Sequence, residues 1–291
     1  MHKQKHISKP DWLKIKIRTN TDFNETSNLM KHQNLNTVCE EARCPNIYEC
    51  WSRRTATIMI LGDICTRACK FCSVKTGKPN LIDDLEPFRV AQGVKGMKLK
   101  HVVITSVDRD DIKSDFGAKI WAKTIREIRK INPTCSIEVL TPDFQGDNNA
   151  LDIVFNAKPN IFSHNIECVE RISKQVRSQS DWRRSKKVLE LSVNNGLITK
   201  TGMMVGLGET DSEVLNTMKE IAELGVQIFN IGQYLQPTKN HLDVDRFVHP
   251  DSFKIYKQEG LKLGFKVVES GPLVRSSYHA EEQVSQLPLS A

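Results

Sequence analysis

Short apolar segments recur along most of the chain, separated by polar or turn-forming residues. From about residue 56 onward, six segments are rich in Val, Ile, Thr or Phe and bounded by Gly, Pro, Asp or Asn, which predicts β-strands. These segments are residues 56–63, 101–107, 136–143, 160–167, 198–208 and 228–235. Their nearly continuous apolar character predicts strands that helices cover on at least one face.

Amphipathic helical patterns lie between the predicted strands. The clearest follows residue 209, where Thr210 and Glu213 have the spacing of a capping box and Gly225 is suited to end a helix. Apolar residues within it recur at spacings of four and three and so share one face, namely Val214, Met218, Ile221 and Leu224. Similar patterns predict helices near residues 86–98, 117–131, 181–195 and 250–263.

The alternation of strands and helices predicts an α/β fold with a parallel sheet and right-handed crossovers. Six units are too few for a complete eight-stranded barrel but enough for a partial (β/α)6 barrel of the TIM type. An open doubly wound sheet is the alternative, because periodicity does not separate the two layouts. We expect the barrel to span residues 56–265, with an N-terminal extension (1–55) and a C-terminal tail (266–291) that do not follow the alternation.

Composition is that of a globular protein. Of the 291 residues, 39% are hydrophobic and 26% charged, which supports a sizeable core and excludes a disordered chain. No apolar run approaches the roughly 18 residues of a membrane span. The N-terminal segment MHKQKHISKP has no apolar stretch behind it, so we expect no secretory signal and a cytoplasmic location. The net charge of +7 is mild and requires no nucleic acid; the basic cluster at 183–187 is interpreted as a solvated helix face.

Cysteine usage adds the first chemical information. Six of the eight cysteines fall within residues 39–72. A protein that is not exported sits in a reducing compartment, where clustered thiols bind metal or carry out redox chemistry more often than they form disulfides. The isolated Cys135 and Cys168 have no partner at ligand spacing, so we expect them to be small core residues.

The second group of cysteines, Cys65, Cys69 and Cys72, has the spacing C-x3-C-x2-C and directly follows the first predicted strand. In a parallel barrel, chemistry takes place at the carboxyl ends of the strands. Three thiolates can hold a four-iron cluster by three corners and leave the fourth iron open to a small ligand, whereas a closed cluster or a structural zinc needs a fourth protein ligand. Three cysteines on one buried helix face are the alternative, which the polar residues between them disfavour.

The first group, Cys39, Cys44 and Cys50, has spacings that do not share a helix face, and Pro45 interrupts regular structure. A loop around a metal centre is the natural interpretation. Because the loop supplies only three thiolates, a fourth ligand must come from elsewhere in the chain. Zinc is the alternative metal for this group.

Several motifs together resemble one enzyme family. Phe71 before Cys72 completes the cysteine signature of the radical S-adenosylmethionine enzymes. The further segments resemble the lipoyl synthases: EARCPNIYECW, VVITSVDRDD, EVLTPDF, HNIECVERI, GLGET, QYLQPT and SGPLVRSSYHA. The resemblance runs from about residue 10 to residue 280. The combination of two three-cysteine motifs with the terminal sequence Arg-Ser-Ser-Tyr (275–278) is highly specific.

The resemblance implies a partial (β/α)6 barrel with both extensions and two 4Fe–4S clusters. Cys65, Cys69 and Cys72 would hold the cluster that binds S-adenosylmethionine through its amino and carboxylate groups. The remaining motif (Cys39, Cys44 and Cys50) would hold an auxiliary cluster, whose fourth ligand would be a serine of the Arg-Ser-Ser-Tyr sequence. We favour Ser277, with Ser276 as the alternative; an ordinary tail hydroxyl is the interpretation that the residues alone would suggest.

The implied reaction acts on an octanoyl chain that is amide-linked to a lysine of a carrier protein. A 5′-deoxyadenosyl radical would remove hydrogen at C6 and then at C8, and the auxiliary cluster would supply two sulfur atoms and be consumed. The implied carriers are the H protein of glycine cleavage and the lipoyl domains of 2-oxoacid dehydrogenases. An electron donor such as ferredoxin or flavodoxin and an iron–sulfur carrier for cluster repair would complete the set of partners, with neither nucleic acid nor membrane among them.

Some residues after the predicted strands are candidates for direct contacts to S-adenosylmethionine. Thr105, Ser106 and Asp108, at the end of the second predicted strand, are candidates for the methionine amino group. Asn165 and Glu167, at the end of the fourth, are candidates for the ribose.

Two further candidate contacts come from Arg177 and from residues 202–209. Arg177 is assigned to the methionine carboxylate, with a surface charge as the alternative. The stretch 202–209 resembles the pattern G-x-I-x-G-x-x-E of the fifth strand, which assigns Met204 and Glu209 to the neighbourhood of adenine. A simple turn at Gly206 is the alternative there.

Two other functions remain to be weighed. A biotin-synthase-like sulfur-inserting enzyme would share the radical chemistry, but the spacing of the first cysteine group and the Arg-Ser-Ser-Tyr sequence disfavour it. A zinc-binding RNA-binding protein would need four-ligand sites and exposed aromatic residues. Three-ligand groups and an aromatic content of 7% disfavour that class.

Overall fold

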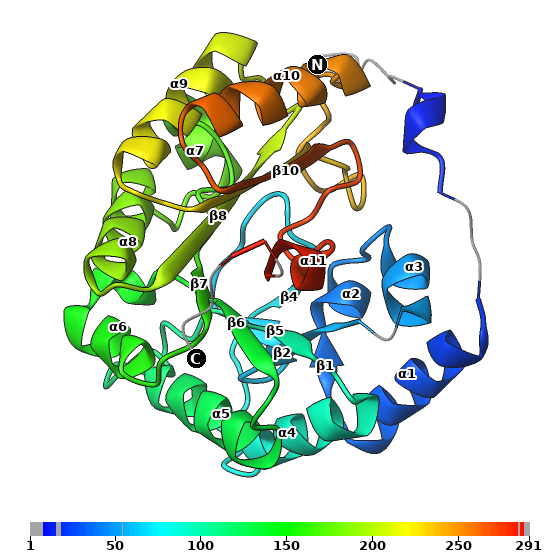
Figure 1. The fold of residues 1–291 in the computed structure, drawn as a ribbon, viewed down its shortest axis with the longest axis vertical. Coiled ribbons are helices and arrows are strands. Elements are labelled where there is room, and N and C mark those ends of the chain that lie inside the picture. The colour runs from blue at the N-terminus through cyan, green and yellow to red at the C-terminus, as the bar shows by residue number, and fades with distance from the viewer. Residues whose placement is uncertain (1–7, 16–18, 54, 285, 288–291) are drawn as a thin grey trace.

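A curved sheet is the central feature of the computed structural model, which describes residues 8–15, 19–53, 55–284 and 286–287 (Figure 1). Within these residues the strands follow the order β1 (Asn36–Thr37), β2 (Thr57–Ile60), β5 (His101–Ser106), β6 (Ser136–Leu140), β7 (Ile161–Ser163), β8 (Ile198–Val205), β9 (Ile228–Gln233) and β10 (Val267–Gly271). Only β1 pairs antiparallel, with β2; the other neighbours are parallel. A separate two-stranded ladder joins β3 (Ile64–Cys65) to β4 (Lys75–Thr76).

The six predicted strands are confirmed as β2 and β5 to β9. Their order in the sheet follows their order along the chain, without the reversal that defines a doubly wound sheet. Helices lie around the outside of the curved sheet (Figure 1). The fold is therefore the predicted partial barrel, and the alternative layout is excluded.

The outer helices are those that follow each strand of the barrel. They are α4 (Glu86–Met97), α5 (Ala118–Ile131), α6 (Asn148–Phe155), α7 (Glu170–Val176), α8 (Trp182–Asn194), α9 (Asp211–Glu223) and α10 (Pro250–Lys262), with a 3-10 turn at Phe144–Gly146. The predicted capping box is confirmed: the Thr210 side chain accepts from the backbone N–H of Glu213, and the Glu213 side chain accepts from that of Thr210. Cys135 and Cys168 are buried core residues, as predicted.

The sheet extends one strand further than the sequence pattern indicates. β10 pairs in parallel with β9, from Val267 opposite Ile228 to Gly271 opposite Gly232. Its sequence, VVESG, has only two apolar residues, so the segment carries too little hydrophobic pattern to be recognised as a strand. The first part of the expected tail thus belongs to the barrel.

The N-terminal extension joins the barrel at β2 through β1, and α11 lies within the ring in the view of Figure 1. The extension contains a 3-10 turn (Asp11–Leu13), α1 (Thr21–His32), α2 (Val38–Glu41) and α3 (Ile47–Ser52), and α11 (Ala280–Val284) is the last helix of the described residues. Val284 and Leu287 pack against the apolar first residues of three strands, namely Ile161, Ile228 and Val267. The tail therefore covers the amino end of the barrel (Figure 1) and leaves the carboxyl end available for a site. Across the described ranges, no helix is long and apolar enough to cross a membrane.

Candidate active site

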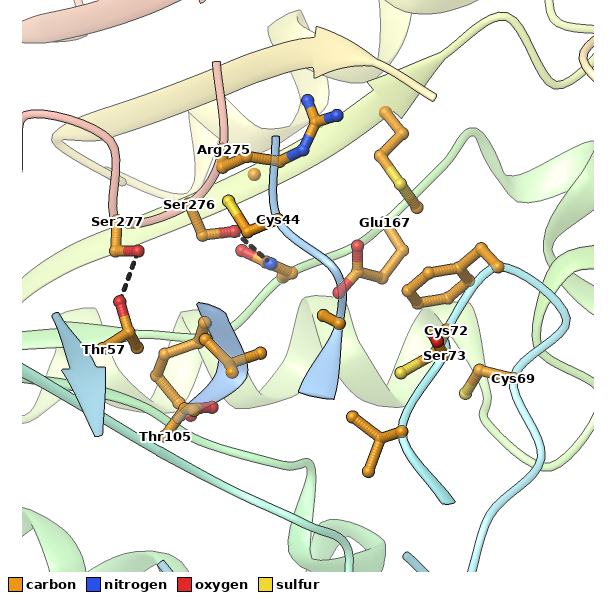
Figure 2. A pocket seen from close by; sticks show the side chains of 18 of the residues that line it. Cys44, Thr57, Cys69, Cys72, Ser73, Thr105, Glu167, Arg275, Ser276 and Ser277 are labelled. Carbon is orange, nitrogen blue, oxygen red and sulfur yellow. Dashed lines mark hydrogen bonds between the residues drawn. The ribbon is translucent and has the colours of Figure 1, made fainter. Parts of the chain in front are cut away.

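A cavity of about 580 Å³ brings the two cysteine motifs together inside the barrel. This volume is typical of a cavity for a small molecule. Cys65, Cys69 and Cys72 line it, and Cys39 and Cys44 line it as well. Figure 2 shows Cys69 and Cys72 on one side of the cavity and Cys44 with the tail serines on the other. Two groups of residues that the sequence keeps apart thus border one space.

A smaller adjoining cavity collects the whole first motif. Its lining includes all three cysteines of that motif and one of the two tail serines: Cys39, Cys44, Cys50 and Ser277. The other serine, Ser276, borders only the large cavity. The structure therefore brings Ser277 to the first motif and leaves Ser276 outside this smaller space.

The cysteines of both motifs are free to bind metal. All eight cysteines are free thiols. Among the residues that the structure describes, no three His, Cys, Asp or Glu side chains converge closely enough to hold one metal ion. Each motif supplies three thiols, which is the number that holds a four-iron cluster by three of its corners.

Cys65 sits at the end of β3 among backbone donors. The N–H groups of Arg67 and Asp108 donate to its sulfur at 3.4 and 3.3 Å, and its thiol lies 3.6 Å from the Asp108 carboxylate. Burial, together with the charge of Asp108, raises the pKa of Cys65 to about 12. If Cys65 bound iron it would do so as a thiolate, and its proton would be released. The two backbone N–H groups would then hydrogen-bond to a ligand sulfur, a contact that influences a cluster's reduction potential.

Cys69 and Cys72 complete the loop. The backbone N–H of Cys72 donates to the Cys69 carbonyl at 3.0 Å, and the Cys72 carbonyl lies 2.9 Å from His241 Nε2. Burial raises the pKa of both thiols; the charge of Asp108 adds to the effect at Cys69, and that of Glu167 at Cys72. The same is true of the first motif, where burial raises the pKa of Cys39 to about 12 and also raises the pKa values of Cys44 and Cys50.

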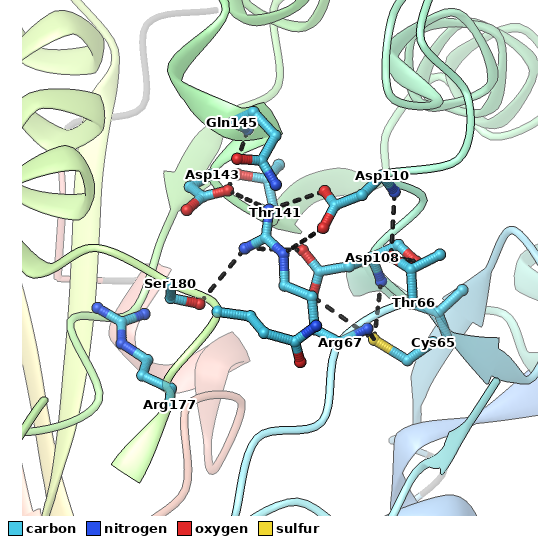
Figure 3. Close-up of polar contacts among 12 residues, drawn as sticks. Cys65, Thr66, Arg67, Asp108, Asp110, Thr141, Asp143, Gln145, Arg177 and Ser180 are labelled. Carbon is cyan, nitrogen blue, oxygen red and sulfur yellow. Dashed lines mark hydrogen bonds and ion pairs between the residues drawn. The ribbon is translucent and has the colours of Figure 1, made fainter. Parts of the chain in front are cut away.

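A buried ionic network anchors this loop to the barrel (Figure 3). The Arg67 guanidinium lies 2.7 Å from a carboxylate oxygen of Asp110 and of Asp143, and 3.2 Å from one of Asp108. Asp108 and Asp110 follow β5, whereas Asp143 follows β6 and also pairs with Arg184 at 2.7 Å. The sequence analysis did not identify Arg67, Asp110 or Asp143; the only available signal was an arginine between two cysteine ligands.

The pKa values of two carboxyls in this network are shifted in opposite directions. Burial raises the pKa of Asp108 to about 6, because it outweighs the attraction of Arg67. At Asp143 burial also acts upward, but the Arg67 hydrogen bond and charge outweigh it and hold the pKa well below its usual range. Asp143 is thus the firmly ionised partner of Arg67.

Polar atoms without a protein partner surround the same cavity. Buried atoms of this kind are Arg177 Nε, Asn165 Oδ1, Asn230 Oδ1 and His164 Nε2, and all four residues line the cavity. Buried polar groups are nearly always hydrogen-bonded, so such atoms indicate a polar ligand. S-adenosylmethionine, with its amino, carboxylate and hydroxyl groups, fits this need.

Arg177 is buried rather than exposed, which excludes the surface-charge alternative. Its guanidinium donates to Ser185 Oγ at 2.9 Å and, at 3.4 Å, to the Asn165 carbonyl. Burial raises the pKa of the nearby Glu167 carboxyl, and the charge of Arg177 offsets only part of that rise. A ligand carboxylate that hydrogen-bonds to the guanidinium would be a closer counter-ion.

The other predicted contact residues divide into two groups. Five line the cavity: Thr105, Ser106, Asp108, Glu167 and Met204. Glu209 does not; its carboxylate accepts the N–H groups of Gly206 and Leu207 at 2.7 and 2.9 Å. Gly206 has a φ of +95°, which glycine adopts readily. Gly206 thus forms a turn after β8, and the Glu209 carboxylate binds the backbone of that turn.

Comparison with solved structures agrees with the fold. Streptococcus suis SuiB bound to S-adenosylmethionine superimposes with a TM-score of 0.60 at 9% identity, over 78% of this chain and 55% of that one. Methylornithine synthase (PylB) superimposes with a TM-score of 0.53 at 12% identity, over 87% of this chain and 83% of that one. At such identities the likeness concerns the fold alone.

Sequence comparison is more specific. Residues 59–221 match the radical SAM superfamily, and residues 1–44 match the N-terminal domain of lipoyl synthase. Lipoyl synthase of Halalkalibacterium halodurans is 51% identical over 98% of this chain and 94% of its own. Lipoyl synthase of Phocaeicola vulgatus is 52% identical over 96% of this chain and 98% of its own.

The chain belongs to the lipoyl synthase family. It is a radical S-adenosylmethionine enzyme, with S-adenosylmethionine and a 4Fe–4S cluster as cofactors. Family membership gives a chemical context for the tail, which carries the Arg-Ser-Ser-Tyr sequence into the barrel.

The tail serines point to different partners. Ser276 Oγ accepts from Asn165 Nδ2 at 2.6 Å, and the Ser276 carbonyl accepts from Asn230 Nδ2 at 2.8 Å. Ser277 Oγ accepts from the Thr57 hydroxyl at 2.6 Å (Figure 2). Ser276 is therefore held beside the candidate S-adenosylmethionine contacts, and Ser277 beside the first cysteine motif.

Contacts on both sides of the serines fix the tail. Before them, Asn46 donates to the Leu273 carbonyl at 2.7 Å. After them, the Tyr278 hydroxyl donates to Glu49 at 3.1 Å, and Arg53 pairs with Glu281 at 2.6 Å. Glu49 and Arg53 flank Cys50, so these contacts join the helix of a predicted ligand to the segment that follows Ser277. No local sequence pattern revealed them.

Proposed function

We propose that the protein inserts two sulfur atoms, at C6 and C8, into an octanoyl group that is amide-linked to a lysine of a carrier protein, giving the dihydrolipoyl group. One observation carries the proposal: the large cavity is lined by the whole second motif, by Cys39 and Cys44 of the first motif and by both tail serines, and the adjoining smaller cavity adds Cys50. Family membership supplies the reaction class.

The bound cofactors would supply a hydrogen-abstracting 5′-deoxyadenosyl group and sulfur, which no amino-acid side chain provides. Cys65, Cys69 and Cys72 would hold the cluster that binds S-adenosylmethionine. Around it, Arg177 would bind the methionine carboxylate, and the residues after β5 would orient its amino group, namely Thr105, Ser106 and Asp108. Asn165 and Glu167 would orient the ribose, and Met204 would contact the adenine side.

Cys39, Cys44, Cys50 and Ser277 would hold the second, auxiliary cluster. The shared lining of the smaller cavity supports this set, and the contact of Ser276 with Asn165 argues against Ser276 as the oxygen ligand. A serine ligand also has a chemical reason. A hard oxygen suits soft cluster iron less well than a thiolate, so it leaves the iron more readily when sulfur is transferred.

The remaining cavity wall suits an acyl chain. Apolar side chains from the extension, the barrel and the loops line it: Val38, Met59, Val74, Val107, Leu140, Met203, Ile231 and Leu235. An octanoyl chain lying against them would present its unactivated carbons between the two cysteine groups. Burial there would also exclude water from reactive intermediates.

We propose three kinds of protein partner. Octanoylated H protein or lipoyl domains would be the substrates, ferredoxin or flavodoxin the electron donor, and an iron–sulfur carrier the source for cluster repair. The net charge of +7 would favour acidic partners.

The parts of the chain would divide the two clusters between them. Residues 1–55 and the tail would hold the auxiliary cluster. The barrel, with β10 added to it, would hold the cluster that binds S-adenosylmethionine.

The test is an anaerobic reaction. The protein is reconstituted with iron and sulfide and incubated with dithionite, S-adenosylmethionine and an octanoyl-lysyl peptide, and mass spectrometry follows the peptide and 5′-deoxyadenosine. We expect a peptide that gains two sulfur atoms. Cys44→Ser should abolish the sulfur gain, whereas Cys135→Ser, a buried cysteine outside both motifs, should retain it. Deoxyadenosine without sulfur gain from a protein carrying both clusters would contradict the proposal.

A further inference from the structure

Thr57 lies among the proposed ligands of the auxiliary cluster. Its side-chain hydroxyl donates to Ser277 Oγ at 2.6 Å, and it lines the smaller cavity together with Cys39, Cys44 and Cys50. It is 3% exposed and lines both cavities. Figure 2 shows its hydroxyl directed at that of Ser277.

The position of Thr57 in the fold makes this contact rigid. Thr57 is the first residue of β2 and is paired with Val103 of the neighbouring β5. Its side chain is β-branched, so few χ1 rotamers are open to it. The hydroxyl is therefore held in place by the barrel, whereas Ser277 belongs to the tail.

This hydrogen bond matters most when Ser277 leaves the iron. An oxygen that is released from iron into a buried site is costly unless a donor meets it. The Thr57 hydroxyl is such a donor and lies within hydrogen-bond distance. A donor bond also draws negative charge from an iron-bound oxygen and so weakens its hold on the iron.

We infer that Thr57 is a positioning residue that holds the Ser277 oxygen and eases its release from the auxiliary cluster. The inference rests on the proposed function, because only a cluster that gives up sulfur needs a ligand that departs. It assigns Thr57 no contact with substrate; the residue acts through Ser277.

The test isolates the auxiliary site in the full-length chain. Cys65, Cys69 and Cys72 are replaced by alanine, and the protein is reconstituted anaerobically with iron-57 and sulfide. Mössbauer spectroscopy then records the iron that lacks a thiolate, and a chelator reports the rate at which the first iron is lost. Neither readout depends on turnover.

Thr57→Val keeps the shape of the side chain and removes the donor. We expect the first iron to be lost roughly fivefold more slowly, as the removal of one buried hydrogen-bond donor would give. The Mössbauer isomer shift of the oxygen-bound iron should change as well. Thr57→Ser, which restores the donor, should return both values to those of the parent protein. Should Thr57→Val not fold, Thr57→Ala carries the same test.

Two controls sharpen the comparison. Thr124→Val removes an equally buried hydroxyl that bonds within α5, to the Ile120 carbonyl at 2.8 Å, and should leave the rate unchanged. Ser277→Ala should speed iron loss, and adding Thr57→Val to it should have no further effect, because the two residues act as a pair.

The outcomes separate the inference from the proposed function. Iron loss from Thr57→Val that is as fast as in the parent, or slowing that persists in the Ser277→Ala background, would overturn the inference alone. A parent protein that binds no iron and sulfide through the first motif would overturn the auxiliary cluster, and the inference with it.

Discussion

Ser276 and Ser277 show how finely the site is resolved at the level of single residues. Both hydroxyls are 2.6 Å from a donor, but one donor is Asn165 and the other is Thr57. The sequence resemblance favours Ser277 but leaves Ser276 open, because both serines fit the same motif. The two side chains face different walls of the cavity, which supports the proposal of Ser277 as the ligand.

The oxygen of Ser277 can be tested by exchanging it for sulfur. Ser277→Cys should retain the auxiliary cluster, because a thiolate binds iron firmly, and should slow sulfur insertion, because that ligand departs less readily. Iron and sulfide analysis with mass spectrometry of the octanoyl-lysyl peptide measures both effects. Ser212→Cys, on the exposed start of α9, is the control for an added thiol. Full sulfur insertion by Ser277→Cys would contradict the assignment.

His164 gives a prediction about pH. Burial lowers the pKa of His164 to about 4, with Nδ1 bonded to the Thr141 carbonyl at 2.9 Å. Between pH 6.5 and 4 the unfolded chain binds a proton at this residue and the folded chain does not, so stability falls as pH falls through this window. The loss amounts to about 3 kcal/mol at pH 4.

His164→Gln should remove this dependence. The free energy of unfolding of the metal-free protein, measured with urea at several pH values from 4.5 to 7, should vary less in the variant than in the parent. His32→Gln, an exposed histidine of α1, should leave the profile of the parent intact. A variant whose profile parallels that of the parent would show that His164 is not the titrating group.

At the scale of elements, the strands of the barrel could be predicted from the sequence, whereas β10 and the short helices α2 and α11 could not. Each of the six predicted strands lies in a segment rich in Val, Ile, Thr or Phe, which is a local signal. β10 carries only Val267 and Val268 as apolar residues and is specified by its pairing with β9. α2, with four residues, and α11, with five, depend on tertiary contacts, because helices this short are unstable alone.

In the candidate site, too, some residues could be identified from the sequence and others could not. The cysteine ligands could be identified because their spacing is local, within 34 residues of sequence. The Arg67–Asp143 contact joins positions 76 residues apart, and the Arg53–Glu281 contact joins positions 228 apart. No pattern along the chain encodes such pairs, because the register of whole elements determines them.

Strand β9 and the tail meet at a glycine. A Cβ at Gly232 would collide with the carbonyl oxygen of Val274, which is backbone and cannot swing aside. Gly232→Ala should therefore push the tail from the barrel and misplace Ser277. We expect the iron content after reconstitution to fall toward that of a single cluster, and the tail to become more sensitive to protease.

Gly271→Ala is the matched control for this prediction. Its Cβ would meet only a methyl group of the same Val274, at 3.3 Å. Iron content and protease resistance should stay close to those of the parent. Equal losses in both variants would mean that general damage to the tail, rather than the contact at Gly232, is responsible.

At the scale of the whole molecule, two parts of the chain hold the two cysteine motifs around one cavity. The Cys65–Cys72 loop is fixed to the ends of β5 and β6 through Arg67. The first motif lies in the N-terminal extension, and the tail joins it through Thr57 and Arg53. Because the two sets of contacts share no residue, loss of one should leave the other in place.

Two truncations test this independence. A chain that ends at Gly271 lacks the tail serines and α11, and a chain that ends at Ser277 lacks α11 but keeps both serines. Both uncover the same apolar residues at the amino end of the barrel, and the shorter chain also lacks the buried Val274 and the Asn46 contact to Leu273, so urea unfolding of both chains is compared first. Both should still bind one cluster and cleave S-adenosylmethionine with dithionite, since the Arg67 contacts remain.

Only the longer chain should add sulfur to an octanoyl-lysyl peptide. Its rate should be reduced, because the contacts of Arg53 and Glu49 to the tail are gone. Sulfur insertion by the shorter chain would show that the tail supplies no ligand, and loss of S-adenosylmethionine cleavage in both would show that the two halves are not independent.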